Sequence, residues 1–289
     1  MSVLINGRVH HHLAVADRGF AYGDGVFETI ACLRGELLLW DRHMSRLEEG
    51  CERLGFPPPT REVLLEEARQ LTGTPGHGNH VLRITVTRGE GGRGYAPPQA
   101  PSPTRVLSVH PWPYPDASSF VHGVDLMQCR TRASCNPSLA GIKHLNRLDN
   151  VLARQEVMAS GADEGLMCQS SGTVVSATQS NLFLVENGVL ITPDLGSAGV
   201  SGTCRAAVLD AAAVINLSVA VEAVTPERVL CADELFLTNS VAGIWPVKQA
   251  LGRPLNVGPV TRSMQRALCR PWMTMYSISL DAPGVGDAP

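Results

Sequence analysis

Lysine is almost absent from this chain. Only Lys143 and Lys248 occur among 289 residues, whereas arginine occurs 22 times. The formal net charge is −3, so the chain lacks the excess of cations that a nucleic-acid or anionic-membrane surface needs. It also lacks an apolar run of the ~20 residues that span a membrane, and its N-terminus lacks the basic region and long apolar core of a signal peptide. We therefore expect a cytoplasmic protein whose partner is a small molecule or another protein chain.

Paired cysteines are also missing. The eight cysteines are scattered, without a CxxC pair and without histidines at zinc-finger spacing. Three consecutive histidines, His10, His11 and His12, would point to alternating faces of a strand and cannot readily converge on one metal ion. We expect free, buried thiols in a reducing compartment and no metal site.

The first 112 residues predict an N-terminal α/β domain. Short strands are expected in VLING, HLAVADRG and VFETIACLRGELLLW, the last folded into a hairpin at Arg34-Gly35. The stretch RHMSRLEEGCERLGF has apolar residues at helical spacing, and Thr60 is suited to cap a second helix, REVLLEEARQL. Two further strands, HVLRITVTRG and TRVLSVHPWP, follow. The first domain is therefore expected to be a sheet covered by two helices.

A linker rich in proline is expected at residues 113–121, followed by a larger domain at 122–280 and a disordered tail at 281–289. The larger domain should contain a helix in NRLDNVLARQEVMAS, a strand in EGLMCQS and a hairpin turned at Asn187-Gly188. Helices after GVSGTC and in TPERVLC and a strand in DELFLTN complete the pattern. Because strands and helices do not alternate strictly, we predict the α+β class with a barrel-like second domain.

Two glycine-rich stretches are candidate binding loops. GEGGRGY contains a formal GxGxxG, but Ala-Pro-Pro follows in place of the helix that a dinucleotide site needs. Its Arg93 and Tyr95 are suited to bind a carboxylate, or they belong to a solvated loop. GSAGVSGTC leads directly into an apolar helix from about Thr203, so the amides from Gly199 to Thr203 would point outward at a phosphate, or the turn is a simple helix cap.

Lys143 stands in an apolar, nearly uncharged stretch, AGIKHLNRLDN. A desolvated lysine there would have a lowered pKa and act as a nucleophilic amine of the kind that Schiff-base chemistry needs. The alternative is an exposed cation near a helix start.

The order of several stretches together resembles one enzyme family across nearly the whole chain. ADRGFAYGDGVFETI, RHMSRL, TRGEGGRGY, IKHLNRLDNVLARQ, SNLFLVENGVLITP, GVSGTCR and TNSVAGIWPV are similar to the class IV aminotransferase-like enzymes that use pyridoxal 5'-phosphate. The resemblance implies the α+β fold type IV of D-amino acid and branched-chain aminotransferases, with a small α/β N-terminal domain, a larger barrel-like α/β C-terminal domain, and a homodimer. GGRGY and IKHLNRL are most similar to members that eliminate pyruvate from 4-amino-4-deoxychorismate to give 4-aminobenzoate for folate synthesis.

The resemblance also implies roles for single residues. Lys143 matches the lysine that holds the cofactor as a Schiff base and acts in catalysis, and Arg46 of RHMSRL matches the arginine that binds the cofactor phosphate. Arg93 and Tyr95 match loop positions that bind a substrate carboxylate. Further cofactor contacts are implied for Val200, Ser201, Ser240 and Val241.

Ser176 departs from the family pattern. It stands where a glutamate usually faces the pyridine nitrogen of the cofactor, as TVVSATQSNLF shows. A hydroxyl cannot keep that nitrogen protonated, so the ring would be a weaker electron sink, which favours elimination over transamination. The alternatives are an aminotransferase acting on branched-chain or D-amino acids, and a non-catalytic binding module on the same fold.

Overall fold

The chain divides into two compact units. The computed structural model describes residues 3–73, 78–113 and 116–280, so the expected disordered tail, 281–289, lies outside the described residues. The first unit comprises Met1–Pro113 and Ile142–Asn146, and the second comprises the rest. The second domain expected at 122–280 is therefore not continuous, because Ile142–Asn146 groups with the first unit.

The expected linker, 113–121, contains a helix. Helix α4, Ala117–His122, begins after Asp116, whose side chain accepts a hydrogen bond from the Ser118 N–H. Phe120 of this helix is fully buried. Residues 117–121 of the expected linker are therefore helical, because a local cap and a buried aromatic ring stabilise a short helix there. Residues 114 and 115 of this stretch lie outside the described residues.

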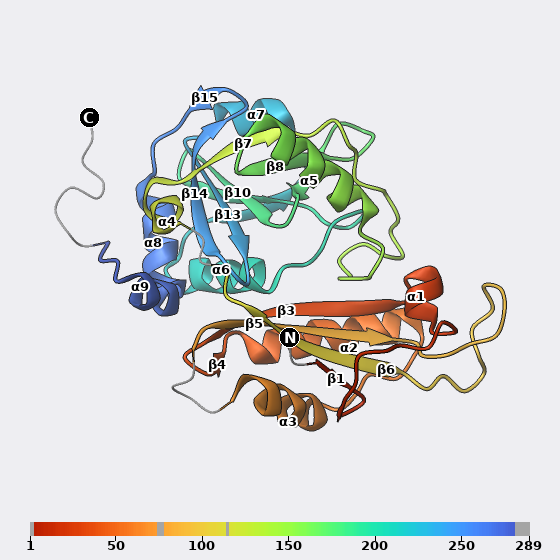
Figure 1. The fold of residues 1–289 in the computed structure, drawn as a ribbon. Helices are drawn as coiled ribbons and strands as arrows, with labels where there is room; N and C mark the ends of the chain where they lie inside the picture. The colour runs from red at the N-terminus through yellow and green to blue at the C-terminus, as the bar shows by residue number, and fades with distance from the viewer. Residues whose placement is uncertain (1–2, 74–77, 114–115, 281–289) are drawn as a thin grey trace. The chain divides into compact units, whose positions relative to one another are not determined.

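The first unit is a six-stranded antiparallel sheet with helices packed on one face (Figure 1). The strand order is β2-β1-β6-β5-β3-β4. The elements are β1 (Val3–Ile5), β2 (Arg8–Val9), α1 (Arg18–Tyr22), β3 (Gly25–Leu33), β4 (Glu36–Leu37), α2 (Trp40–Leu54), α3 (Arg61–Thr72), β5 (His80–Thr87) and β6 (Thr104–Pro111).

Side-chain alternation gives this sheet two different faces. Leu82, Ile84 and Val86 of β5 are buried in the core formed with α2 and α3. Because successive side chains of a strand point to opposite faces, Arg83 of β5 and Phe27 of β3 lie on the face away from that core. This second face carries part of the candidate site.

Most local predictions for the first unit are confirmed. The hairpin turns at Arg34 and Gly35, which both have positive φ, and the Thr60 side chain accepts a hydrogen bond from the N–H of Val63 at the start of α3. The strand expected in HLAVADRG is wrong, because α1 begins within it. The Asp17 side chain caps that helix by accepting a hydrogen bond from the Gly19 N–H at 2.8 Å.

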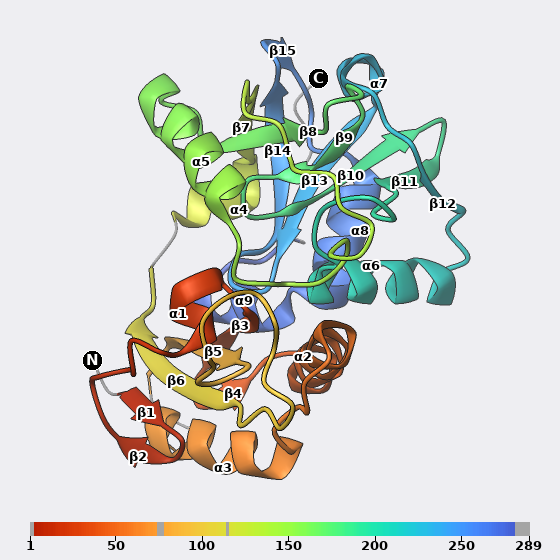
Figure 2. The ribbon, with the colours of Figure 1, turned by 90° about the vertical axis from the view of Figure 1, so that its right-hand side faces the viewer.

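The second unit contains a curled, mixed nine-stranded sheet with helices around it (Figure 2). The strand order is β12-β11-β10-β13-β14-β7-β8-β9, with β15 paired to β14. Besides α4, the elements are β7 (Val124–Gln128), α5 (Leu148–Ser160), β8 (Glu164–Cys168), β9 (Val174–Ala177), β10 (Asn181–Glu186), β11 (Val189–Pro193), α6 (Thr203–Val214), β12 (Val219–Glu222), α7 (Pro226–Cys231), β13 (Glu234–Asn239), β14 (Gly243–Ala250), β15 (Arg253–Pro254), α8 (Pro259–Leu268) and α9 (Arg270–Tyr276).

The α+β class and the curled second sheet confirm the predicted fold. The hairpin between β10 and β11 turns at Asn187 and Gly188, both with positive φ, as the Asn-Gly pair predicts. Strand β14 and helices α8 and α9 were not expected from the sequence. In the described ranges, none of the helices combines the length and the apolar content that a membrane crossing requires.

Candidate active site

Lys143 lies on a short extended segment of the first unit. Residues Ile142–Asn146 run beside the start of β3. The Phe27 N–H donates to the Lys143 carbonyl at 2.9 Å, and the Leu145 N–H donates to the Gly25 carbonyl at 3.0 Å. Backbone hydrogen bonds therefore fix the segment at Lys143 and two residues after it.

The Lys143 amine and the Arg83 guanidinium share one aromatic ring. Nζ of Lys143 lies 4.3 Å from the ring centroid of Phe27, and Cζ of Arg83 lies 4.2 Å from the same centroid. Such contacts are favourable because the face of an aromatic ring is electron-rich. Both cations therefore lie against the same aromatic ring.

The Arg83 side chain makes no hydrogen bond or ion pair with any residue in the described ranges. It is half-buried on β5, an interior strand of the sheet, and burial lowers the pKa of its guanidinium. A partly desolvated guanidinium without a protein acceptor is suited to bind a carboxylate through two parallel hydrogen bonds. Sequence reasoning missed Arg83, although a lone cation in the middle of the apolar strand HVLRITVT is a usable signal.

Glu28, His43 and Arg46 form a buried polar cluster where β3 faces α2. Nε of Arg46 donates to Oε1 of Glu28 at 2.8 Å, and an Nη of Arg46 donates to Oε2 at 2.5 Å. Nδ1 of His43 lies 2.6 Å from the same Oε2. Burial lowers the pKa of His43, and the charges of Arg46 and Lys143 lower it further, so we assign a neutral ring that donates to Glu28. The charges of Lys143 and Arg46 both act on the His43 ring, so the two cations lie near the same buried side chain.

We predict that Glu28 makes the free energy of unfolding depend on pH in the acidic range. Burial by itself raises its pKa, but the Arg46 charge and the hydrogen bonds from His43 and Arg46 outweigh burial and lower it from 4.5 to about 2. A lowered folded-state pKa contributes stability above pH 4.5 that is lost as pH falls toward 2. Glu28→Gln should cost roughly 3–5 kcal/mol at pH 7, because Arg46 loses its buried partner, and should flatten the stability profile between pH 4.5 and about 2.

Chemical denaturation at several pH values checks this prediction. Glu49→Gln is the matched control, because Glu49 is another acid paired with an arginine of α2, yet its side chain is 64% exposed. The control should change stability by less than about 1 kcal/mol. Equal losses in the two variants would contradict the assignment of Glu28.

In the second unit, residues 199–203 form a turn that leads into α6. Gly199 has a φ of +89°, and a Cβ added to Gly202 would overlap Oδ1 of Asn181, so the turn leaves no room for side chains there. The Ser201 N–H donates to the Gly141 carbonyl at 3.0 Å. The expectation that all amides of this turn point outward is therefore wrong for Ser201, because the turn pairs with Gly141 as a short parallel bridge.

A second turn, residues 239–243, is joined to the start of α6. The Cys204 thiol donates to the Asn239 carbonyl at 3.2 Å. Oδ1 of Asn239 accepts a hydrogen bond from the Val241 N–H at 2.9 Å, so the Val241 amide is used inside its own turn. The structure thus brings Ser240 and Val241 beside the first turn of α6, where the helix dipole favours an anion.

Ser176 is half-buried on β9 of the same unit. Its hydroxyl donates to the carbonyl of Ala177 at 2.9 Å. The nearby strand β8 begins with Glu164, a fully buried acid that could in principle replace the missing family glutamate.

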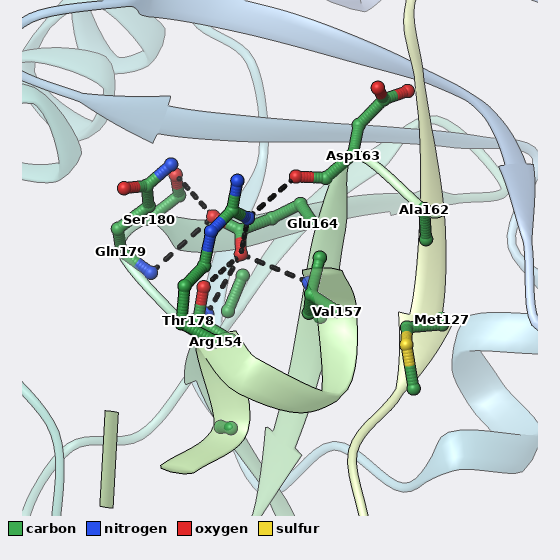
Figure 3. Close-up of polar contacts among 12 residues, drawn as sticks. Met127, Arg154, Val157, Ala162, Asp163, Glu164, Thr178, Gln179 and Ser180 are labelled. Carbon is green, nitrogen blue, oxygen red and sulfur yellow. Dashed lines mark hydrogen bonds and ion pairs between the residues drawn. The ribbon is translucent and has the colours of Figure 1, made fainter. Parts of the chain in front are cut away.

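Glu164 is instead surrounded by donors, as Figure 3 shows. Oε1 accepts hydrogen bonds from the amide and the hydroxyl of Thr178, and Oε2 accepts from the Gln179 N–H at 3.3 Å and the Ser180 hydroxyl at 3.2 Å. Arg154 Nη1 lies 3.8 Å from Oε1. Because both oxygens are engaged, we interpret Glu164 as a structural acid that holds the turn after β9.

Arg93 and Tyr95 lie on the loop of residues 88–103 in the first unit, which contains no helix, as expected. Both side chains are exposed, and Tyr95 is 87% exposed. The Tyr95 ring packs at a tilt against the Tyr22 ring of α1, with centroids 5.6 Å apart. The loop therefore presents a guanidinium and a phenol to solvent from an ordered position.

The chain belongs to the amino-transferase class IV family, whose model matches residues 25–250. This membership confirms the resemblance seen in the sequence. An aminodeoxychorismate lyase from Vibrio harveyi is 34% identical over 266 residues, which cover 90% of this chain and 97% of that protein. A putative branched-chain-amino-acid aminotransferase from Methanocaldococcus jannaschii is 30% identical, with 92% of this chain and 94% of that protein covered.

Solved structures agree with this membership. The crystal structure of 4-amino-4-deoxychorismate lyase from Pseudomonas aeruginosa matches with a TM-score of 0.86 and 45% identity, covering 91% of this chain and 97% of that chain. A branched-chain amino acid aminotransferase from Escherichia coli matches with a TM-score of 0.83 at 24% identity, covering 99% and 98%, which supports the fold alone.

Proposed function

We propose that this chain is a pyridoxal-phosphate-dependent lyase that eliminates pyruvate from 4-amino-4-deoxychorismate and releases 4-aminobenzoate. One observation carries the proposal at the level of the site: the Lys143 amine shares the Phe27 ring with Arg83, a half-buried guanidinium without a protein partner in the described ranges. An amine beside an anion-binding cation suits a substrate that carries both an amine and carboxylates. The Vibrio and Pseudomonas lyases support the choice of substrate.

The residues present fit the cofactor. Helix α6 begins after Gly202 without a side-chain cap, and we assign the cofactor phosphate to this turn and to the Ser201 hydroxyl. The phosphate-binding role of Arg46 stays a prediction from the sequence. Val200, Ser240 and Val241 shape the two turns, and Ser176 is assigned to the pyridine ring. When bound, pyridoxal 5'-phosphate supplies an electron sink for the carbon that carries the substrate amine.

Lys143 is the proposed base. Its Nζ takes the proton from C4 of the substrate, the bond between the ring and the enolpyruvyl oxygen breaks, and the six-membered ring becomes aromatic. The leaving group departs as enolpyruvate, which takes up a proton at its methylene carbon to become pyruvate. Aromatisation makes the step strongly downhill. Arg83, together with Arg93 and Tyr95, binds the substrate carboxylates and orients C4 toward the amine.

The direct test is incubation of the purified chain with pyridoxal phosphate and 4-amino-4-deoxychorismate. Equal amounts of 4-aminobenzoate and pyruvate are expected. A parallel assay with branched-chain or D-amino acids and a 2-oxo acid acceptor tests the aminotransferase alternative. Consumption of the 2-oxo acid without release of 4-aminobenzoate would overturn the proposal, and inactivity in both assays would favour a binding module.

Residue 176 should influence the choice between the two reactions. Ser176→Glu places a carboxylate where the family usually carries one, and a protonated ring nitrogen strengthens the electron sink that transamination needs. We expect side transamination to rise severalfold relative to elimination, measured as the ratio of new amino acid to 4-aminobenzoate. Ser176→Gln, which has similar size and no charge, is the control, and an unchanged ratio in Ser176→Glu would contradict the prediction.

We further propose that the chain forms a homodimer and works in the cytoplasm. Helix α5 exposes an apolar row, with Leu148 at 75%, Val151 at 50%, Leu152 at 52% and Met158 at 74% exposure. These side chains recur at helical spacing, which is typical of a face that packs on another protein. Sedimentation equilibrium should give twice the chain mass. All eight cysteines are free thiols, which suits a reducing compartment.

A further inference from the structure

Arg18 binds the backbone of the loop that carries Arg93 and Tyr95. It is only 4% exposed at the start of α1. Its Nε donates to Oδ2 of Asp24 at 2.8 Å, and its two terminal nitrogens donate to the carbonyls of three consecutive loop residues, 94–96, at 3.0 to 3.4 Å. One buried guanidinium therefore connects a fixed acid to the part of the loop that contains Tyr95.

The start of α1 is itself held against this loop. Oδ2 of Asp17 accepts a hydrogen bond from the Thr87 hydroxyl at 2.8 Å, and the Arg18 N–H donates to the Gly89 carbonyl at 2.9 Å. A Cβ on Gly19 would overlap the methyl group of Thr87. The sequence Asp17-Arg18-Gly19 thus forms a rigid base at the point where the loop leaves β5.

Because Gly91 has no side chain, the aliphatic part of the Arg18 side chain can pack against its backbone. A Cβ at position 91 would lie 2.7 Å from Cδ and 3.0 Å from Cγ of Arg18. Those carbons cannot move aside freely, because the guanidinium is bound to Asp24 and to the loop carbonyls. Arg18 therefore restricts the backbone of the loop, and Gly91 of the loop restricts the path of the Arg18 side chain.

We propose that Arg18 is a positioning residue that sets residues 91–96 of this loop, so that Arg93 and Tyr95 meet the substrate carboxylate. Arg18 contacts the loop backbone and leaves recognition to the exposed side chains. A lysine cannot replace it, since a single ammonium cannot bind Asp24 and three successive carbonyls at once. The inference rests on the proposed function for the identity of the substrate, but the loop contact stands on geometry alone.

Steady-state kinetics of Arg18→Lys and Gly91→Ala test the proposal. Because charge-assisted hydrogen bonds are lost or displaced, KM for 4-amino-4-deoxychorismate should rise about tenfold or more in both variants, while kcat changes less than about threefold. The affinity for pyridoxal phosphate should be unchanged. Arg88→Lys is the matched control: Arg88 is 7% exposed and also binds Asp24, but its other donors reach the carbonyls of Leu54 and Gly55. The control should keep the wild-type KM.

Limited trypsin digestion without substrate tests the loop independently of activity. Arg93 is exposed, so opening of the loop should raise the cleavage rate after Arg93 about tenfold in Arg18→Lys, with fragments of residues 1–93 and 94–289, and leave it unchanged in Arg88→Lys. Wild-type KM and wild-type cleavage in Arg18→Lys, or equal changes in Arg88→Lys, would overturn the proposal. A wild-type enzyme without lyase activity would defeat the proposed function, and the digestion would still decide whether Arg18 holds the loop.

Discussion

Lys143→Ala should lower lyase turnover by at least about 10³-fold, because it removes the amine that we propose both to hold the cofactor and to act as the base at substrate C4. The visible absorption band of lysine-bound cofactor should disappear with it. Lys143→Arg is the sharper variant, since it keeps a cation on the Phe27 ring but cannot form a Schiff base at ordinary pH. Turnover assays and absorption spectra of the purified variants check both expectations.

The second lysine of the chain provides the control. Lys248 lies 3.8 Å from Asp125 and its side chain is 47% exposed, so it is an ordinary surface lysine. Lys248→Ala should keep the band and the wild-type turnover. Retention of either property in Lys143→Ala would refute the assignment of Lys143.

Arg83→Gln should lower kcat/KM for 4-amino-4-deoxychorismate by about 100-fold. The reason is the loss of charged hydrogen bonds to a substrate carboxylate in a partly desolvated place, worth about 3 kcal/mol in total. The loss should fall mainly on KM, and Arg83→Lys should recover part of it. The fold should not depend on Arg83, which contacts no acid in the described ranges.

Arg105→Gln is the matched control for Arg83. Arg105 lies on the neighbouring strand β6 and is paired with Glu67 at 2.8 Å, so its charge is already satisfied by the protein. It should change stability with less than about a twofold effect on KM. If Arg83→Gln kept the wild-type KM, Arg83 would have to be withdrawn from the substrate site.

Features with a local cause could be predicted along the chain. The Thr60 cap and the Asn187-Gly188 turn depend on residues a few positions apart, and both are confirmed. The strand expected in HLAVADRG is wrong because two local signals compete there, and the Asp17 cap outweighs the alternation of apolar residues.

Contacts between residues far apart in sequence could not be predicted in this way. The backbone bond from Ser201 to Gly141 and the thiol bond from Cys204 to Asn239 each join different elements of the second unit. The first bond uses the Ser201 amide inside the protein, and the second joins the turn of residues 239–243 to the start of α6. The assigned roles of Val200, Ser201, Ser240 and Val241 stay predictions.

The sequence by itself determined the family, the α+β class and the scarcity of lysine that singles out Lys143, because motif order and composition are properties of the chain alone. Only the tertiary structure decided what surrounds that lysine. Phe27 and Arg83 come from two neighbouring strands, and Lys143 joins them from a segment more than fifty residues further along the chain. Strand pairing and side-chain alternation place these three side chains on one face of the sheet. No local sequence pattern predicts contacts between residues so far apart in the chain.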